Sequence, residues 1–574
     1  MKKFTALFLA ILMIVSCLTA CGDKKDDTKK EDTKKEDTTT PSTPSTGDKT
    51  DEGQKEEKPK RTEKVTITVG IKRNANVEDY ETNAQTLWLE EQCNVDLEFF
   101  YFPADGTAAL QQLNLMMAGE EELPDILYSI GISTAAAAEM GEDGYLVDLA
   151  PYFADPELSP VFHEAIKDLT YPEDAEAIVK NGTDPETGHM WGFPTYQCAS
   201  GADHITNHIY INTKWLEAVG EDMPTTPDEL YTVLKKFKTE DPNGNGLADE
   251  MPMVGSHSLT RADTAEWIIN AYIYCNDNYF WTRDEKGNLT QPYTTDEYRE
   301  ALKMVNKMYE EGLLSPQFFT LKSTTEMKEI WTPSSGTAIA GISAGHIQNC
   351  YNANSELVFD YAYAPALDAG TGKGGYRGQN TRSFAYASFI TTDCEYPDAA
   401  FEVLDAMTSE EGFLRVRYGV PGEDWVYAEE GQLDMFGNQA HINVLDGTIL
   451  SGQNNHSWHL LATTVADYRK YTMVAPQGAT DYTGRNTEWR NNFIAQGLAE
   501  ETAPNLQFTI WYPSSVSAEV SELTTSVKNY IMEQRALFIT GDIDINSDAD
   551  WNNYLKEVEA AGLSRWQELA EQYA

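Results

Sequence analysis

Strand-like and helix-like apolar patterns alternate at the start of the apolar part of the chain. Every second residue from 65 to 71 is apolar, as is every second residue from 95 to 101, so both segments predict half-buried strands. A helical pattern around residues 87–89 lies between them, and a second, at 110–117, precedes the segment Pro-Asp-Ile-Leu at 124–127. The order strand, helix, strand, helix, strand predicts a parallel sheet.

The remainder of the sequence is also mixed α/β. Thr226 is a predicted N-cap, Pro227 occupies the first helical position, and Glu229 completes a capping box before apolar residues at helical spacing. Further helical patterns cover residues 297–309, 397–407, 516–538 and 551–571. More than 500 of the 574 residues follow position 62. A chain of this length exceeds what one core usually serves, so we expect two lobes or domains.

The first residues have the order of an export signal. Lys2 and Lys3 precede an apolar run at 4–15, and Leu-Thr-Ala then leads into Cys21. The run is shorter than the ~20 residues that span a bilayer. The arrangement looks like a lipobox, which predicts a signal peptide at 1–20 and a lipid on Cys21 at the outer, extracellular face of the cell membrane. The alternative is a plain signal peptide with an incidental cysteine.

Residues 21–62 follow as a lipidated cysteine and a polar stalk. The stalk is built from Lys, Asp, Glu, Thr, Ser, Pro and Gly with almost no apolar side chains. Such a segment cannot bury enough surface to offset its conformational entropy. We therefore expect a disordered tether.

Charge and cysteine content narrow the classes of partner. The formal net charge is -49 with 92 acidic residues, which argues against nucleic-acid binding through a basic surface. Beyond Cys17 and Cys21, five cysteines remain, scattered and without C-x-x-C spacing. They are Cys93, Cys198, Cys275, Cys350 and Cys394. We interpret them mostly as buried thiols rather than disulfides or metal ligands.

Several short segments, in this order, resemble family 1 extracellular solute-binding proteins of ABC sugar importers. They are Gly-Glu-Glu-Glu-Leu-Pro-Asp-Ile at 119–126, Gly-Tyr-Leu-Val-Asp-Leu at 144–149, Gly-His-Met-Trp-Gly-Phe-Pro at 188–194, Ile-Tyr-Ile-Asn-Thr-Lys-Trp-Leu at 209–216, and 397–412. The resemblance implies a type 2 periplasmic-binding-protein fold, with two α/β lobes that hinge and close on a ligand between them.

Lobe boundaries follow from placing the chain on that pattern. The expected N-terminal lobe contains residues 63–195 plus 363–420. The expected C-terminal lobe contains residues 196–362 plus 421–574.

A loop at 241–250 predicts a bound cation. Side-chain oxygens stand at alternate positions 241, 243 and 245, and two glycines between and after them permit a tight curl. Ca²⁺ favours six to eight such oxygens. Pro252 stands where an EF-hand places its bidentate Glu, so the full motif is not met. The alternative is an ordinary Asn/Gly turn.

The same loop is similar to the calcium loop of alginate-binding members of the family. That resemblance implies a structural Ca²⁺ held by Asp241, Asn243, Asn245, the carbonyl of Leu247, Asp249 and Glu250.

Sugar sites pair aromatic platforms with hydrogen-bonding groups. Position in the family pattern selects seven ligand-binding candidates: Trp191, Tyr196, Trp267, His346, Tyr376, Arg377 and Trp511. For any one aromatic residue, a packing role in the core is an equal alternative. Residues 454–459 combine Asn, His, Ser and Trp, and we interpret them as a surface loop.

The leading hypothesis is a non-catalytic, monomeric receptor that binds a carbohydrate and delivers it to an ABC permease. A secreted glycoside hydrolase is the first alternative, and it requires two carboxylates about 5 to 10 Å apart. A glycan-sensing or adhesion lipoprotein without transport is the second. The sequence contains no G-x-S-x-G, P-loop or dinucleotide-binding fingerprint.

Overall fold

The structure is a computed structural model. It describes residues 61–198, 207–276, 280–284, 286–333, 336–346, 350–352, 355–375, 382–434, 437–445, 447–450, 452–459, 463–475 and 510–574. The predicted signal peptide, Cys21 and nearly all of the stalk lie outside these residues.

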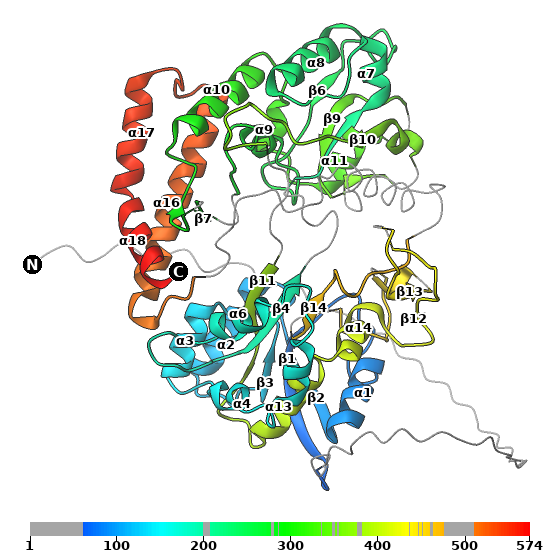
Figure 1. Cartoon of the computed structure of the whole chain (residues 1–574), viewed down its shortest axis with the longest axis vertical. Coiled ribbons are helices and arrows are strands. Elements are labelled where there is room, and N and C mark those ends of the chain that lie inside the picture. Colours follow the sequence, from blue (N-terminus) through cyan, green and yellow to red (C-terminus); the bar gives the residue numbers. More distant parts are fainter. Residues whose placement is uncertain are drawn as a thin grey trace, which may run out of the picture. The chain divides into compact units, whose positions relative to one another are not determined.

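A six-stranded sheet forms the centre of what we call the first lobe (Figure 1). Its strand order is β14-β4-β11-β3-β1-β2. The strands are β1 (Val65–Lys72), β2 (Val95–Phe102), β3 (Ile126–Tyr128), β4 (Phe193–Cys198), β11 (Arg382–Ile390) and β14 (Val465–Asp467). β1 pairs in parallel with β2 and β3, which confirms the predicted parallel unit. β11 runs antiparallel to β3 and β4.

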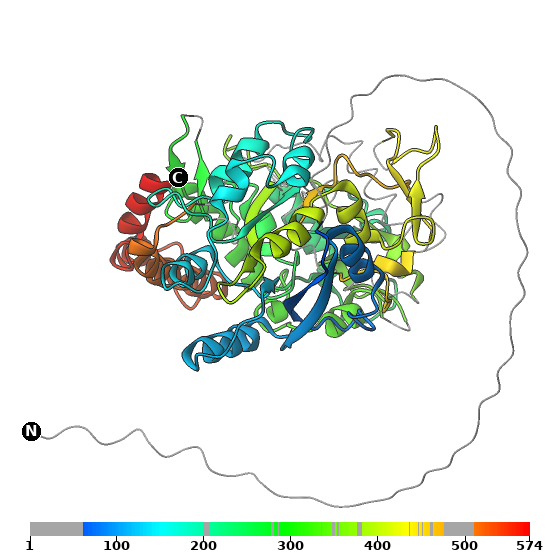
Figure 2. The same cartoon turned by 90° about the horizontal axis from the view of Figure 1, so that it is seen from below.

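Helices and the inward residues of these strands make the first core. Ile67, Val69 and Ile71 of β1 are fully or almost fully buried. On one face, α1 and α13 lie side by side (Figure 2). The helices of this lobe are α1 (Ala84–Cys93), α2 (Gly106–Ala118), α3 (Thr134–Glu142), α4 (Ala150–Ala154), α5 (Pro160–Ala165), α6 (Asp174–Asn181), α13 (Pro397–Ala406) and α14 (Glu410–Tyr418), with the 3-10 helix η4 (Gly447–Leu450).

A four-stranded sheet, in the order β10-β5-β9-β6, centres the second lobe. Its strands are β5 (Ile209–Asn212), β6 (Met251–Met253), β9 (Ala340–Ala344) and β10 (Tyr361–Tyr363). Its helices are α7 (Thr213–Val219), α8 (Pro227–Thr239), α9 (Thr264–Ile269), α10 (Asp296–Glu310), α11 (Thr324–Trp331), α16 (Ser514–Thr540), α17 (Asp548–Ala560) and α18 (Leu563–Tyr573), with 3-10 helices η2 (Pro316–Phe319) and η3 (Glu356–Asp360). Two small sheets, β7 (Thr282–Arg283) with β8 (Leu289–Thr290) and β12 (Trp425–Tyr427) with β13 (Ile442–Val444), complete the strands.

The helix patterns of the sequence have direct counterparts, with one exception. The capping box at Thr226 and Glu229 is present at the start of α8. The single helix expected over 551–571 is instead two, α17 and α18, because Gly562 between them has a φ of 106°. A Cβ at Gly562 would also come within 2.3 Å of the Leu523 side chain. Only glycine meets both conditions without strain.

Several packing contacts bear on the lobe boundaries, which stay a prediction. β14 lies within 421–574, yet it pairs with β4 in the first sheet, and Trp458 and Trp511 belong to the first core. β14 shields a strand edge of β4 that would otherwise remain open. Leu367 packs in the second core although it falls within 363–420. We therefore propose that the first lobe contains residues 61–198, 382–475 and Trp511, and that the second contains residues 207–375 and 514–574.

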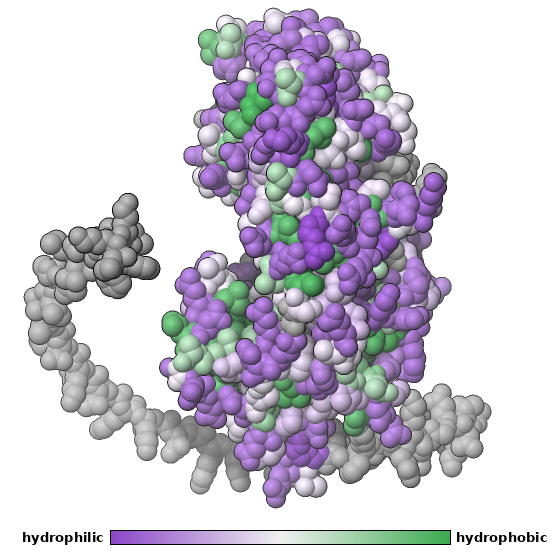
Figure 3. Space-filling model, turned by 90° about the vertical axis from the view of Figure 1, so that its left-hand side faces the viewer, coloured by the Kyte–Doolittle hydropathy of each residue, from purple (hydrophilic) through white to green (hydrophobic). Residues whose placement is uncertain are grey.

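The described surface is largely polar on one face (Figure 3), and the described thiols are buried. The face shown in Figure 3 is largely hydrophilic, with scattered apolar residues. Among the described residues, no helix is both long and apolar enough to cross a membrane. The five cysteines beyond position 21 are all buried, which confirms the interpretation as buried thiols.

Candidate ligand-binding site

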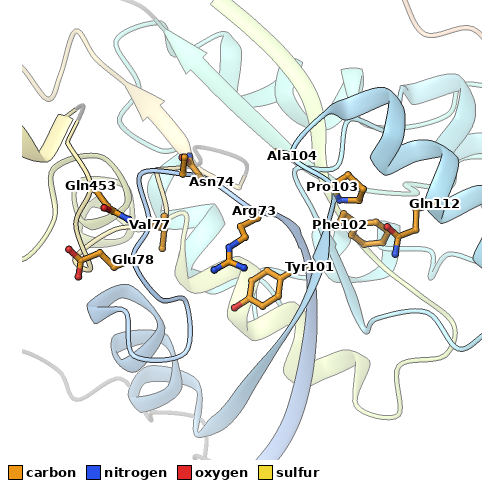
Figure 4. A pocket seen from close by; sticks show the side chains of 11 residues that line it. Arg73, Asn74, Val77, Glu78, Tyr101, Phe102, Pro103, Ala104, Gln112 and Gln453 are labelled. Atoms are coloured by element: carbon orange, nitrogen blue, oxygen red, sulfur yellow. The ribbon is translucent and has the colours of Figure 1, made fainter. Parts of the chain in front are cut away.

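A cavity of about 680 Å³ lies where β1 and β2 end. Arg73 and Asn74 follow β1, Tyr101 and Phe102 close β2, and a side chain of α2 and one from residue 453 complete the lining (Figure 4). Ligands of open parallel sheets bind outside the carboxyl ends of the strands. The cavity is at that edge, and its volume is within the range of about 300–1,000 Å³ typical of small-molecule sites.

Arg73 and Tyr101 form a stacked pair in this cavity. The guanidinium carbon lies 5.4 Å from the centroid of the Tyr101 ring, which is cation–π geometry. Tyr101 is 38% exposed. Burial is the main cause that raises the pKa of Tyr101, and the carboxylates of Glu81 and Asp79 raise it further, while Arg73 opposes them. Among the described residues Arg73 makes no ion pair, so its N–H groups are available to a ligand.

Residues 454–459, which we call the clasp, bind the segment between β1 and α1. The amide of Glu78 donates to the carbonyl of Asn454 (3.0 Å), and the amide of Ala84 donates to the carbonyl of Asn455 (2.9 Å). The side-chain amide of Asn455 donates to the hydroxyl of Thr82 (3.0 Å). The clasp therefore fixes the neighbouring Gln453 at the rim of the cavity.

Trp458 anchors the clasp in the first core. Its ring is 1% exposed and meets Phe99 and Tyr128 edge-on, at centroid distances of 5.5 and 5.4 Å. Its indole nitrogen donates to the Thr86 hydroxyl at 2.9 Å. The expected surface loop is thus partly a core element, because its tryptophan fills the space beside β2 and β3.

A second cluster of polar and aromatic side chains lies at one end of the strands of the four-stranded sheet. β5 is antiparallel to both β9 and β10, so its start meets their ends. The ring of His208 lies 5.4 Å from that of His346 and 5.9 Å from that of Tyr363. Arg261 Nη1 lies 3.2 Å from His208 Nε2. These strand ends bring hydrogen-bond donors, acceptors and aromatic rings together. One of them, His346, is a predicted ligand residue.

The other predicted ligand residues are distributed between two cores or lie outside the described residues. Trp191, Tyr196 and Trp511 belong to the first core, and Trp267 belongs to the second. A Cβ at Gly141 would come within 2.1 Å of the Trp191 ring. The Tyr196 hydroxyl donates to Asp174, and the Trp267 indole donates to the carbonyl of Pro365. Tyr376 and Arg377 lie outside the described residues. The role of the seven in binding remains a prediction.

Sequence reasoning missed the residues that line the cavity. These are Arg73, Asn74, Tyr101, Gln112 and Gln453, among others. The first three carried a usable signal, because they end or directly follow the strands predicted at 65–71 and 95–101. Gln453 carried none, since its position depends on the clasp.

The loop at 241–250 is tightly curled, as predicted. Asp241 has a φ of 48°, and Gly244 and Gly246 have φ values of 67° and 74°. The two carboxylate oxygens of Asp241 accept hydrogen bonds from the amides of Asn245 (3.1 Å) and Gly246 (3.0 Å). Asn243 also accepts from the Asn245 amide, at 3.0 Å. The curl turns these oxygens toward one another.

Two acidic side chains close the other end of the loop. Asp249 accepts from the side-chain amide of Asn245 at 3.0 and 3.2 Å. Oε1 of Glu250 is buried and has no hydrogen-bond partner among the described residues. Burial raises the pKa of Glu250, as do the charges of Asp249 and Asp241. Within the described residues, no group of three or more His, Cys, Asp or Glu side chains is placed to hold a metal, so a cation here would also need amide and main-chain oxygens.

Comparison with known proteins decides the family. The family model of bacterial extracellular solute-binding proteins matches residues 75–412. The chain belongs to this family. The solute-binding protein is 25% identical over 445 residues to lipoprotein LipO of Bacillus subtilis, covering 75% of this chain and 78% of LipO. It is 24% identical over 520 residues to the fructooligosaccharide ABC transporter substrate-binding protein FusA of Streptococcus pneumoniae, covering 84% and 85% of the two chains.

Solved structures show the same two-lobe fold. An HMO-binding, ABC-transporter-associated solute-binding protein from Bifidobacterium longum infantis superposes with a TM-score of 0.69 at 22% identity. The match covers 89% of this chain and 99% of that chain. FusA in complex with kestose superposes with a TM-score of 0.66 at 19% identity, covering 88% and 98%. A second FusA structure is of an EF-hand mutant, and a structure of the alginate-binding protein AlgQ2, with a TM-score of 0.59 at 18% identity and coverage of 89% and 98%, is described as without calcium ion.

Proposed function

We propose that this solute-binding protein is a lipid-anchored, monomeric receptor that captures an extracellular oligosaccharide and delivers it to the permease of an ABC transporter. The cavity at the carboxyl edge of β1 and β2 carries the proposal. It presents an aromatic ring, a guanidinium and several amides, which is the combination that sugar hydroxyls and C–H faces require. The oligosaccharide-binding relatives support the same class of ligand.

A thermal-shift screen of the mature chain tests the ligand class. The probes are kestose, maltotriose, xylotriose and trigalacturonate, with glycine as a non-sugar control. At ~100 times its dissociation constant, a ligand adds ~2.7 kcal/mol to the free energy of unfolding. We expect at least one glycan to raise the melting temperature and to be recovered uncleaved. Release of shorter sugars would favour the glycoside hydrolase alternative instead.

Cys21 supplies the membrane anchor in this proposal. Arg61, where the described structure begins, is held by Asn94, whose side-chain amide donates to its carbonyl at 2.6 Å. The tether therefore joins the lobe at the amino end of β1, whereas the cavity lies at the carboxyl end, roughly 26 Å away along the strand. A stalk of about forty residues has a root-mean-square reach of ~35 Å. A tether of this reach would keep the receptor near a permease in the same membrane.

Replacing the lipidated cysteine tests the anchor. Cys21→Ser leaves no thiol for the lipid, and two or more acyl chains are what make anchoring stable. We expect the variant to move from the membrane fraction to the medium with unchanged glycan affinity, measured by calorimetry on the released protein. Retention of Cys21→Ser in the membrane fraction would refute lipid attachment at this residue.

The curled loop at 241–250 is proposed to hold a structural Ca²⁺. Asp241, Asn243, Asn245, Asp249, Glu250 and the carbonyl of Leu247 are the proposed ligands. The buried, unpartnered Glu250 oxygen fits this role, because such an oxygen is costly without a hydrogen bond or a cation. The EF-hand of FusA supports the assignment. When bound, the ion would neutralise the acidic end of the loop and fix it beside α8.

A further inference from the structure

We propose that the cavity beside β1 and β2 is a subsite for an uncharged sugar unit, held on the Arg73–Tyr101 pair between Gln112 and Gln453, and that it rejects uronic acids. The inference rests on the proposed receptor function. It specifies which part of the molecule contacts the ligand and which chemical class of sugar can bind there.

The cavity has a floor and two walls. Figure 4 shows Arg73 and Tyr101 in the middle, with Gln112 beside Phe102 and Pro103 on one side and Gln453 beside Glu78 on the other. The floor belongs to the ends of β1 and β2, and one wall belongs to α2. The other wall is fixed by the clasp, which pairs residue 454 with residue 77 in a parallel bridge. A ligand in the cavity therefore meets amide groups from two sides.

The lining chemistry matches hydroxyl groups. Each glutamine amide has two donors and one acceptor oxygen, so it can both give and receive hydrogen bonds with a sugar hydroxyl. The guanidinium supplies donors only, and its cation–π contact with Tyr101 holds it in the cavity. The exposed part of the Tyr101 ring and Pro103 offer apolar surface for sugar C–H groups.

The charge around the floor opposes an anionic ligand. Arg73 is the one cation of the lining, and Glu78 is its one anion. Beyond the lining, Asp79 and Glu81 flank Tyr80 in the chain, and the Tyr80 ring centroid lies 5.8 Å from that of Tyr101. These three carboxylates outnumber the two cations, Arg73 and Lys72, whose ammonium lies beside Gly106 at the start of α2. The chain carries a net charge of -49 overall. A uronate carboxylate is repelled here, whereas a neutral sugar is not.

Calorimetric titration of the mature chain with trisaccharides of matched ring number tests the inference. Kestose and maltotriose are the neutral probes, and trigalacturonate is the acidic probe. We expect a neutral probe to bind and trigalacturonate not to bind. Gln112→Ala and Gln453→Ala should each weaken the neutral probe by about 3- to 10-fold, the effect of losing one net hydrogen bond. Arg73→Met should weaken it by at least as much, because hydrogen bonds to charged groups are stronger.

Gln111→Ala is the matched control, because Gln111 precedes Gln112 on α2, is exposed and does not line the cavity. Its affinity should equal that of the unchanged chain. Trigalacturonate binding as tightly as the neutral probes, or unchanged affinity in both Gln112→Ala and Gln453→Ala, would overturn the subsite while the receptor function stands. If no glycan of either class binds, the receptor function and the subsite both fail.

Discussion

Arg535→Met should lower the free energy of unfolding by about 3–5 kcal/mol, the usual cost of removing one partner from a buried ion pair. Nη2 of Arg535 on α16 donates to both oxygens of Asp263 at 3.0 Å, and the two side chains are 3% and 11% exposed. Asp263 is also the N-cap of α9 and accepts from the Glu266 amide at 2.8 Å. Without Arg535 its charge stays buried beside a half-exposed histidine, His257, whose ring nitrogen is 3.4 Å away. Urea titration followed by circular dichroism measures the loss.

The double variant Arg535→Met with Asp263→Asn is the control. Asparagine keeps the capping oxygen of α9 and removes the charge, so the double variant should regain a large part of the lost stability. A loss below about 1 kcal/mol in Arg535→Met would contradict the structural role of the pair.

The Arg535–Asp263 pair also determines the direction in which the free energy of unfolding changes with pH. Burial alone raises the pKa of Asp263, but Arg535, His257 and the Glu266 amide together lower it more, so it lies below its usual value. A depressed carboxyl pKa stabilises the fold above the unfolded value, about 3.9, and this contribution is lost as the pH falls through the folded value. We therefore expect the penalty of Arg535→Met to shrink below about pH 4.

Removing calcium from the solute-binding protein with a chelator should lower its melting temperature and release about one calcium per chain. At a free calcium concentration ~100 times the dissociation constant, the ion contributes ~2.7 kcal/mol to the free energy of unfolding, and EDTA removes this contribution. Differential scanning calorimetry with and without EDTA, together with elemental analysis of protein purified without chelator, measures both quantities.

Two aspartates provide a matched pair for this measurement. Asp249→Asn should abolish the EDTA effect, since it removes one of the three carboxylates of the loop. Asp284→Asn should not, because Asp284 lies in a comparable turn between β7 and β8, where it accepts from the amides of Lys286 and Asn288 at 2.9 and 2.8 Å. An EDTA effect equal in both variants, or no bound metal, would eliminate the loop as a calcium site.

Local patterns predicted the elements of this fold well, because each depends on neighbouring residues. The alternation at 65–71 and 95–101 corresponds to β1 and β2, and the capping box at Thr226 begins α8. The family resemblance predicted the two lobes. The return of β14 to the first sheet was not predictable, because the pairing partner of a three-residue strand is decided by distant residues.

Candidate ligand residues were harder to select than elements. Aromatic residues serve cores and sugar sites equally, so Trp191, Tyr196 and Trp267 had no local mark of burial. Positions after predicted parallel strands, such as Arg73 and Asn74, were the better guide, because the geometry of such sheets gathers loops at one edge. Gln453 reaches the same cavity only through contacts that no local window contains.

The complete cavity also depends on the clasp, which comes late in the chain. Its hydrogen bonds to the segment after β1 and to the first turn of α1 join residues 371 to 378 positions apart in the chain. Contacts of such long range form late, because a long loop must close before they contribute. One wall of the cavity therefore depends on residues that follow β1 and β2 by more than 350 positions. A fragment ending before the clasp would lack the Gln453 wall and would have no complete pocket.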